Sequence, residues 1–131
     1  MSLISDLHHI NIRTSDLTAT KAFFMDTLGL TEGWRPQTLS GRPGAWLYAG
    51  DRPIVHLSTA DEPTAESRGA ALDHVAFSIG DYETVLARVE GCGLPFETFG
   101  TETSPRRQII VRDPSGAMVE LHWRNPSPAA A

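Results

Sequence analysis

The sequence predicts an α+β domain made of two βαβββ modules in tandem. Residues 7–13 and residues 72–79 alternate apolar and polar side chains, as half-buried strands do. After each stretch come an aspartate that can cap a helix, an apolar stripe at helical spacing, and a glycine where the helix would stop. The remainder of each half predicts three further strands, so the same order of elements occurs twice in 131 residues.

The positions of polar residues agree with this duplication. His9 and His74 occupy the same place in the two predicted first strands, each 7 residues before the aspartate that caps its helix. His56 follows His9 by 47 residues, and Glu120 follows His74 by 46 residues. A duplicated module therefore places His56 and Glu120 at equivalent positions in the last strand of each half.

We expect a single domain over residues 1–124, with module one at 7–59, a linker at 60–70 and module two at 71–124. The tail, 125–131, has little to bury and is expected to be disordered. Further elements are predicted as a helix over 17–28 between a cap at Ser15 or Asp16 and a stop at Gly29, strands at 30–35, 45–49 and 54–58, a helix from Asp81 to Gly93, and strands at 94–99, 108–111 and 117–123.

Composition limits the class of protein. A net charge of −5 argues against nucleic acid or an anionic membrane as the partner. The one cysteine, Cys92, cannot form an intrachain disulfide, which fits a reducing compartment. No apolar stretch reaches membrane-spanning length, and the N-terminus lacks the basic and apolar regions of a signal peptide. We therefore expect a soluble cytoplasmic protein that acts on a small molecule.

Strand parity groups the candidate functional residues. His9, His56, His74 and Glu120 all lie on the strand face opposite the apolar residues that a helix would cover. If the modules pair about a pseudo-twofold axis, these side chains meet in one cleft between curled sheets. Such donors suit a divalent metal, namely Fe, Mn, Ni or Zn, and leave open positions for substrate. A lone histidine in a strand is usually structural, but four candidates at matched positions favour a metal site.

Four motifs carry a resemblance to a known family: Leu7-His8-His9-Ile10-Asn11-Ile12, Phe23-Phe24 through Leu28-Gly29-Leu30, Leu72-Asp73-His74-Val75-Ala76-Phe77, and Asp113-Pro114-Ser115-Gly116 leading to Val119-Glu120-Leu121. Over residues 7–124 the chain resembles the vicinal oxygen chelate superfamily. Its members include glyoxalase I, fosfomycin-resistance enzymes, methylmalonyl-CoA epimerase, extradiol dioxygenases and metal-free bleomycin-binding proteins. The resemblance implies metal ligands at His9, His74 and Glu120, and it implies a homodimer.

At His56 the sequence departs from the family pattern. Glyoxalase I has a glutamate ligand at this position, and the epimerase has a glutamine. A histidine here is either a fourth ligand or an unligated acid/base. We expect His56 or Glu120 to move the proton of the reaction.

The favoured function is that of a glyoxalase-like lyase or isomerase. One divalent metal would bind two vicinal oxygens of a small substrate and stabilise the charge of an enediolate-like intermediate. Trp46 and Tyr48 share a strand face and are expected to wall the substrate, unless they serve only sheet packing. Arg13, on the face of His9, is expected to meet an anionic group, unless it is simply solvated.

Two alternatives stay open. An extradiol-type ring-cleaving dioxygenase would use the same three ligands. That interpretation is weakened because residues 108–112 contain no tyrosine and residues 100–107 contain no histidine. A ligand-binding or resistance protein without catalysis is the other alternative, and the presence of the three ligands argues against it.

Overall fold

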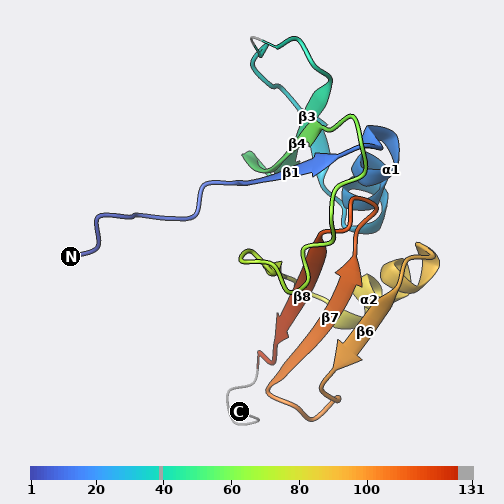
Figure 1. Ribbon diagram of the computed structural model, residues 1–131. Helices are drawn as coiled ribbons and strands as arrows, with labels where there is room; N and C mark the ends of the chain where they lie inside the picture. Colours follow the sequence, from blue (N-terminus) through green and yellow to red (C-terminus); the bar gives the residue numbers. More distant parts are fainter. Residues whose placement is uncertain (39, 127–131) are drawn as a thin grey trace.

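The computed structural model describes residues 1–38 and 40–126, which form two modules with one four-stranded sheet each (Figure 1). The strand orders are β1-β4-β3-β2 and β5-β8-β7-β6. The predicted α+β fold of two βαβββ modules is thus confirmed. Their elements are β1 (Ile10–Thr14), α1 (Leu17–Ala22), η1 (Phe23–Thr27), β2 (Thr31–Gly33), β3 (Gly44–Ala49) and β4 (Arg52–Thr59), then β5 (His74–Ser78), α2 (Tyr82–Gly91), β6 (Phe96–Phe99), β7 (Arg106–Arg112) and β8 (Met118–Arg124).

Two further predictions concern the C-terminal tail and the absence of a membrane-spanning segment. Most of the tail predicted to be disordered, residues 127–131, lies outside the described residues. Within residues 1–38 and 40–126, none of the helices has the length and hydropathy needed to cross a membrane.

The helices begin and end where the sequence predicts. A side-chain oxygen of Asp16, and one of Asp81, accepts the backbone N–H three residues further on, at 3.0 and 3.2 Å. Each bond satisfies a donor that has no partner within the helix. Gly29 and Gly93 follow the helices with φ of 78° and 76°, a conformation that favours glycine. The first helix closes with a π-helical turn, η1, which apolar spacing over so short a stretch does not distinguish from an α-helix.

The first strand begins later than predicted. Its ladder with β4 starts at Ile10, which pairs with Val55, so His9 lies just before the strand and not within it. The preceding residues leave the sheet and extend away from the body of the protein (Figure 1). A strand requires backbone hydrogen-bond partners, and the residue pattern of one segment does not reveal where those partners begin.

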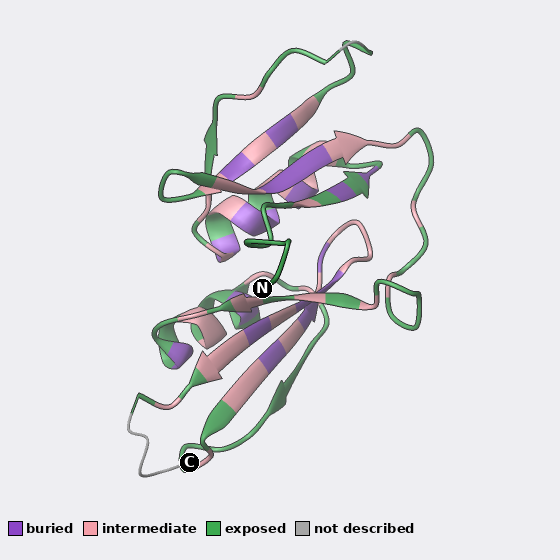
Figure 2. Cartoon of the chain, turned by 90° about the vertical axis from the view of Figure 1, so that its left-hand side faces the viewer, coloured by how far each residue is buried: buried purple, intermediate pink, exposed green. Residues whose placement is uncertain are grey.

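The apolar face of each sheet packs against the helix of its own module. Val55 and Leu57 of β4, like Val119 and Leu121 of β8, are 2% exposed or less. Phe24, in the π-helical turn, is fully buried with them. The core is therefore confined to one side of each sheet (Figure 2).

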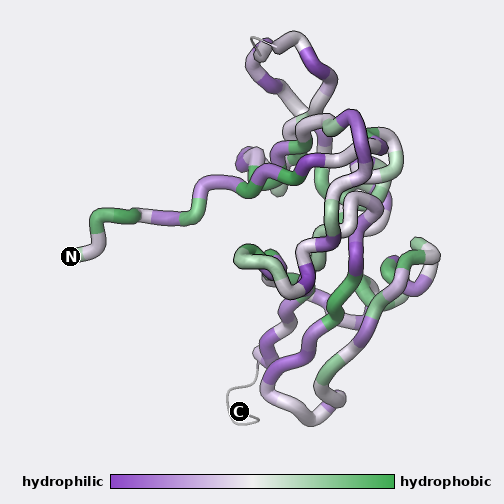
Figure 3. Tube along the Cα trace, in the orientation of Figure 1, coloured by the Kyte–Doolittle hydropathy of each residue, from purple (hydrophilic) through white to green (hydrophobic). Residues whose placement is uncertain are grey.

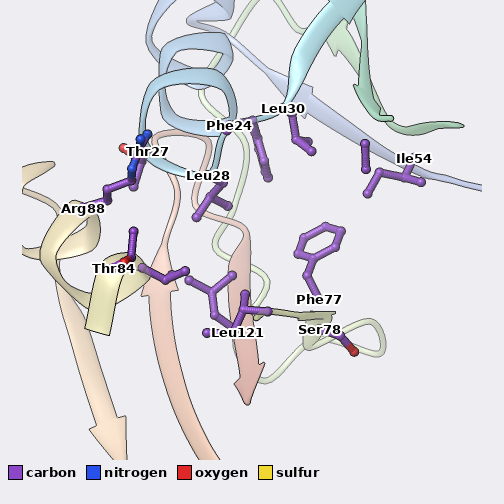
Figure 4. A pocket seen from close by; sticks show the side chains of 14 residues that line it. Phe24, Thr27, Leu28, Leu30, Ile54, Phe77, Ser78, Thr84, Arg88 and Leu121 are labelled. Atoms are coloured by element: carbon purple, nitrogen blue, oxygen red, sulfur yellow. The ribbon is translucent and has the colours of Figure 1, made fainter. Parts of the chain in front are cut away.

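The two modules turn these helix-covered faces toward each other. A cavity of about 480 Å³ lies between them, lined by Phe24, Leu28 and Ile54 from the first module and by Phe77 and Leu121 from the second (Figure 4). His9, His56, His74 and Glu120 are not among the residues that line this cavity.

The hairpin turn between β7 and β8 is built around one carboxylate. Oδ1 of Asp113 accepts the backbone N–H groups of Ser115 and Ala117, at 2.9 and 2.8 Å, and the Ser115 hydroxyl at 2.6 Å. Asp113 is 3% exposed, and burial raises the pKa of its carboxyl above the usual range. The Asp113 carboxylate thereby accepts two backbone N–H groups of the hairpin turn, those of Ser115 and Ala117.

Asp113→Ala is expected to lower the free energy of unfolding by about 3 kcal/mol, since it removes three hydrogen bonds worth about 1 kcal/mol each. Urea unfolding followed by circular dichroism measures the change. Asp51→Ala is the matched control, because Asp51 is an exposed aspartate in the turn between β3 and β4. Equal stability of the two variants would contradict the assigned role of the Asp113 carboxylate.

Candidate metal centre

In the first module, His9 and His56 lie face to face. Their ring centroids are 3.7 Å apart and their planes differ by 11°. Trp46 stacks on the other face of His56, at 3.9 Å and 13°, because the register of β3 and β4 pairs these two residues. The His56 side chain is therefore buried, at 6% exposure, although it lies on the face away from the helix.

The surroundings of His56 favour its neutral form. Nε2 of the ring is buried and has no hydrogen-bond partner among the described residues, whereas the backbone at Pro53 favours the protonated ring. Burial, followed by the positive charge of His9, lowers the pKa of His56. A neutral ring with a lone pair on Nε2 can bind a metal or accept a proton.

In the second module, Asp73 orients His74. Oδ2 of Asp73 lies 2.8 Å from Nδ1 of His74, and Oδ1 accepts the backbone N–H of Gly69 at 2.6 Å. The Gly69 bond first, and the His74 bond second, lower the pKa of Asp73. Because an ionised carboxylate accepts only, Nδ1 of His74 donates and Nε2 keeps its lone pair. A carboxylate partner of this kind fixes the ring of a histidine ligand and increases its basicity.

Glu120 faces His74 from the neighbouring strand. Its Oε1 lies 3.9 Å from Nε2 of His74, and its Oε2 lies 3.7 Å from Nδ1 of His122. The 3.9 Å separation exceeds a hydrogen bond, yet it is less than twice the usual ligand distance of about 2.1 Å. One ion can therefore contact both Glu120 and His74.

The four candidate ligands form two pairs in one chain, His9 with His56 and His74 with Glu120. Among the described residues, no three histidine, cysteine, aspartate or glutamate side chains are grouped closely enough to hold a metal together. None of the four candidate ligands lines the cavity between the helix-covered faces of the two modules.

The two aromatic residues predicted to wall the substrate have different positions. Trp46 lies beside His56, as described above. Tyr48 turns toward β2 instead: its ring covers Gly33, and its hydroxyl donates to the backbone carbonyl of Trp34 at 2.6 Å. Tyr48 therefore positions Trp34. Of the two predicted wall residues, Trp46 and Tyr48, only Trp46 lies next to a candidate ligand, His56.

Arg13 is an exposed residue of β1 in the first module. It lines a groove together with His74 of the second module. Two residues near the candidate ligands were not predicted, Asp73 and Trp34. For Asp73 the sequence did offer a signal, because this carboxylate directly precedes the candidate ligand His74 and could have been predicted to orient it. Trp34 carried no such signal, since it lies in a short stretch whose neighbours in space come from a distant part of the chain.

Two tandem βαβββ modules, with His9 and His74 at equivalent positions, define the class of fold. A family model, the Glyoxalase/Bleomycin resistance protein/Dioxygenase superfamily, matches residues 6–121. The chain belongs to this superfamily, as the resemblance of its motifs implied.

Relatives of the chain agree with this assignment. The uncharacterized protein YaeR of Escherichia coli is 31% identical over 125 residues, covering 91% of this chain and 96% of that protein. Glutathione transferase FosA of Serratia marcescens is 26% identical over 122 residues, covering 92% and 82%. The crystal structure of the fosfomycin resistance protein FosX from Listeria monocytogenes matches with a TM-score of 0.73 at 19% identity, covering 95% of this chain and 97% of that one, and it supports the fold alone.

Proposed function

We propose that the chain is a divalent-metal-dependent, glyoxalase-like lyase or isomerase acting on a small substrate with two vicinal oxygens. One observation carries the proposal. In the second module an Nδ1 hydrogen bond to Asp73 holds His74 and leaves its Nε2 beside Glu120; in the first module Nε2 of His56 is buried without a partner among the described residues, and its ring stacks on His9. The superfamily includes metal-dependent enzymes, which agrees with this donor set.

His9, His74 and Glu120 are the proposed ligands. When bound, a divalent metal polarises two neighbouring substrate oxygens and offsets the negative charge that develops on them. His56 is proposed to accept a proton at Nε2 and to return it, since its ring is neutral and its plane is held between His9 and Trp46. Glu120 is the second group able to move a proton.

We propose further that a complete site takes its ligands from two copies of the chain. The candidate ligands form two separate pairs among the described residues of one chain, and β1 and β5 are both edge strands with one open side. Apolar side chains project next to these edges: Leu3, Ile4 and Leu7 on the N-terminal arm and Leu72 before β5 are 97%, 79%, 68% and 87% exposed (Figure 3). Contiguous exposed apolar residues and open strand edges mark association sites, so we expect a homodimer.

The rings of Trp34 and Trp46 near His56 favour a second candidate function, an extradiol-type dioxygenase that acts on an aromatic diol. The same three ligands would serve it. A panel of catechols with oxygen-uptake measurement separates this activity from lyase or isomerase activity. A binding protein without catalysis would retain metal and ligands but turn over neither class of substrate.

Metal retention tests the proposal directly. Wild-type protein reconstituted with Mn²⁺, Ni²⁺, Fe²⁺ or Zn²⁺ and then desalted is expected to retain one of these ions in stoichiometric amount by elemental analysis. His74→Ala is expected to abolish retention, because it removes a ligand that Asp73 holds in place. Asp51→Ala is the control, since Asp51 is an exposed residue in the turn between β3 and β4 and is not a proposed ligand. If the wild-type protein retains none of the four metals, the proposed metal-dependent function is wrong.

A further inference from the structure

A row of aromatic rings leads from the protein surface to a candidate metal ligand. Trp34 lies edge-on to Trp46, with centroids 6.0 Å apart and an interplanar angle of 86°. Trp46 lies flat on His56 at 3.9 Å, and His56 lies flat on His9 at 3.7 Å. The polar face of the first module is therefore aromatic from its outer strand to His9.

The outermost ring of this row is exposed but its backbone is fixed. Trp34 is 73% exposed, and its carbonyl accepts the Tyr48 hydroxyl at 2.6 Å. The Tyr48 ring lies so close over Gly33 that a Cβ there would come within 2.6 Å of it. A bare glycine at position 33 thus lets Tyr48 lie across β2 and hold the start of the following loop. The indole of Trp34 presents a large apolar surface to water from an anchored position.

The chemistry of this surface selects a flat apolar group. Aromatic rings stack on indole with a gain beyond that of area burial, and an aliphatic group of similar size does not obtain this gain. Resting on the proposed function, we infer that the substrate carries a planar aromatic ring in addition to its two chelating oxygens. Trp34 is then a specificity-determining residue that binds the ring, and Trp46 forms the side of the same surface nearer to His56.

Two hydroxamates test this inference on the metal-reconstituted, full-length protein. Acetohydroxamate and benzohydroxamate both chelate a divalent metal through two neighbouring oxygens, and they differ in a methyl against a phenyl group. Isothermal titration gives both dissociation constants, and the ratio measured with free metal corrects for the intrinsic difference between the chelators. Wild-type protein is expected to prefer benzohydroxamate by about tenfold, the effect of ring stacking together with buried apolar area.

Trp34→Ala is expected to reduce this preference to near unity while metal content and acetohydroxamate affinity stay unchanged. Trp34→Phe is expected to retain most of the preference. Phe96→Ala is the matched control, since Phe96 is an exposed aromatic residue on β6 whose register with Val111 and Val119 places it on the face opposite Glu120. Equal binding of both hydroxamates by the wild type, or a preference that survives in Trp34→Ala, overturns the inference. Failure of both hydroxamates to bind protein that is loaded with metal counts against the proposed vicinal-oxygen function itself.

Discussion

Mixing two metal-free variants, His9→Ala and His74→Ala, is expected to restore metal binding. If each site combines module one of one copy with module two of the other, a heterodimer of the two variants contains one site with both lesions and one with none. The intact site should bind one ion, whereas each variant alone should bind none. If the ligands came from one chain, every site in the mixture would carry a lesion.

Two affinity tags allow heterodimers to be purified after co-expression, and elemental analysis then gives the metal content per dimer. A mixture of His74→Ala and Glu120→Ala is the control, because both changes lie in module two and no combination leaves a site intact. Light scattering on the wild type supplies the mass. A monomer at every concentration, or heterodimers without metal when wild-type protein retains it, would refute the shared site.

His56→Ala is expected to keep the metal and to reduce turnover by about a hundredfold or more, the usual contribution of a general acid/base. The expectation follows from a neutral ring whose Nε2 has no other partner among the described residues. Metal titration and steady-state kinetics measure the two effects separately. If His56 is a fourth ligand instead, His56→Ala weakens metal affinity and His56→Glu restores it.

His56→Phe separates chemistry from packing. Phenylalanine keeps a flat ring between His9 and Trp46 but carries no nitrogen, so the His56→Phe variant should lose turnover as His56→Ala does while preserving stability better.

A site with His9, His74, Glu120 and a neutral His56 has one anionic donor against a dication, which favours a substrate that ionises on binding. If His56→Ala leaves both metal affinity and turnover intact, His56 has neither role.

Much of the fold was predictable because its signals are local. Asp16 and Asp81 accept hydrogen bonds from residues three positions away, and Gly29 and Gly93 adopt φ values that follow from their own missing side chains. Alternation identified the apolar faces for the same reason, since successive residues of a strand necessarily point in opposite directions. These features, together with the duplicated spacing, predicted two βαβββ modules and the family.

The candidate site depended on contacts between distant segments. The burial of His56 comes from Trp46 on the adjacent strand β3 and from His9, which lies just before β1. The backbone of Trp34 is positioned by the Tyr48 hydroxyl, which donates to the Trp34 carbonyl from the neighbouring strand β3.

The sequence by itself determined which residues share the polar face of each sheet, because side-chain parity is a property of a single strand. Only the tertiary structure decided which faces of the two modules meet. The apolar surfaces of helices and sheets are buried against each other in the chain, and among the described residues His9 and His56 are not grouped with His74 and Glu120. Burial of apolar area is not directional and depends on how whole modules pack, which no local pattern encodes.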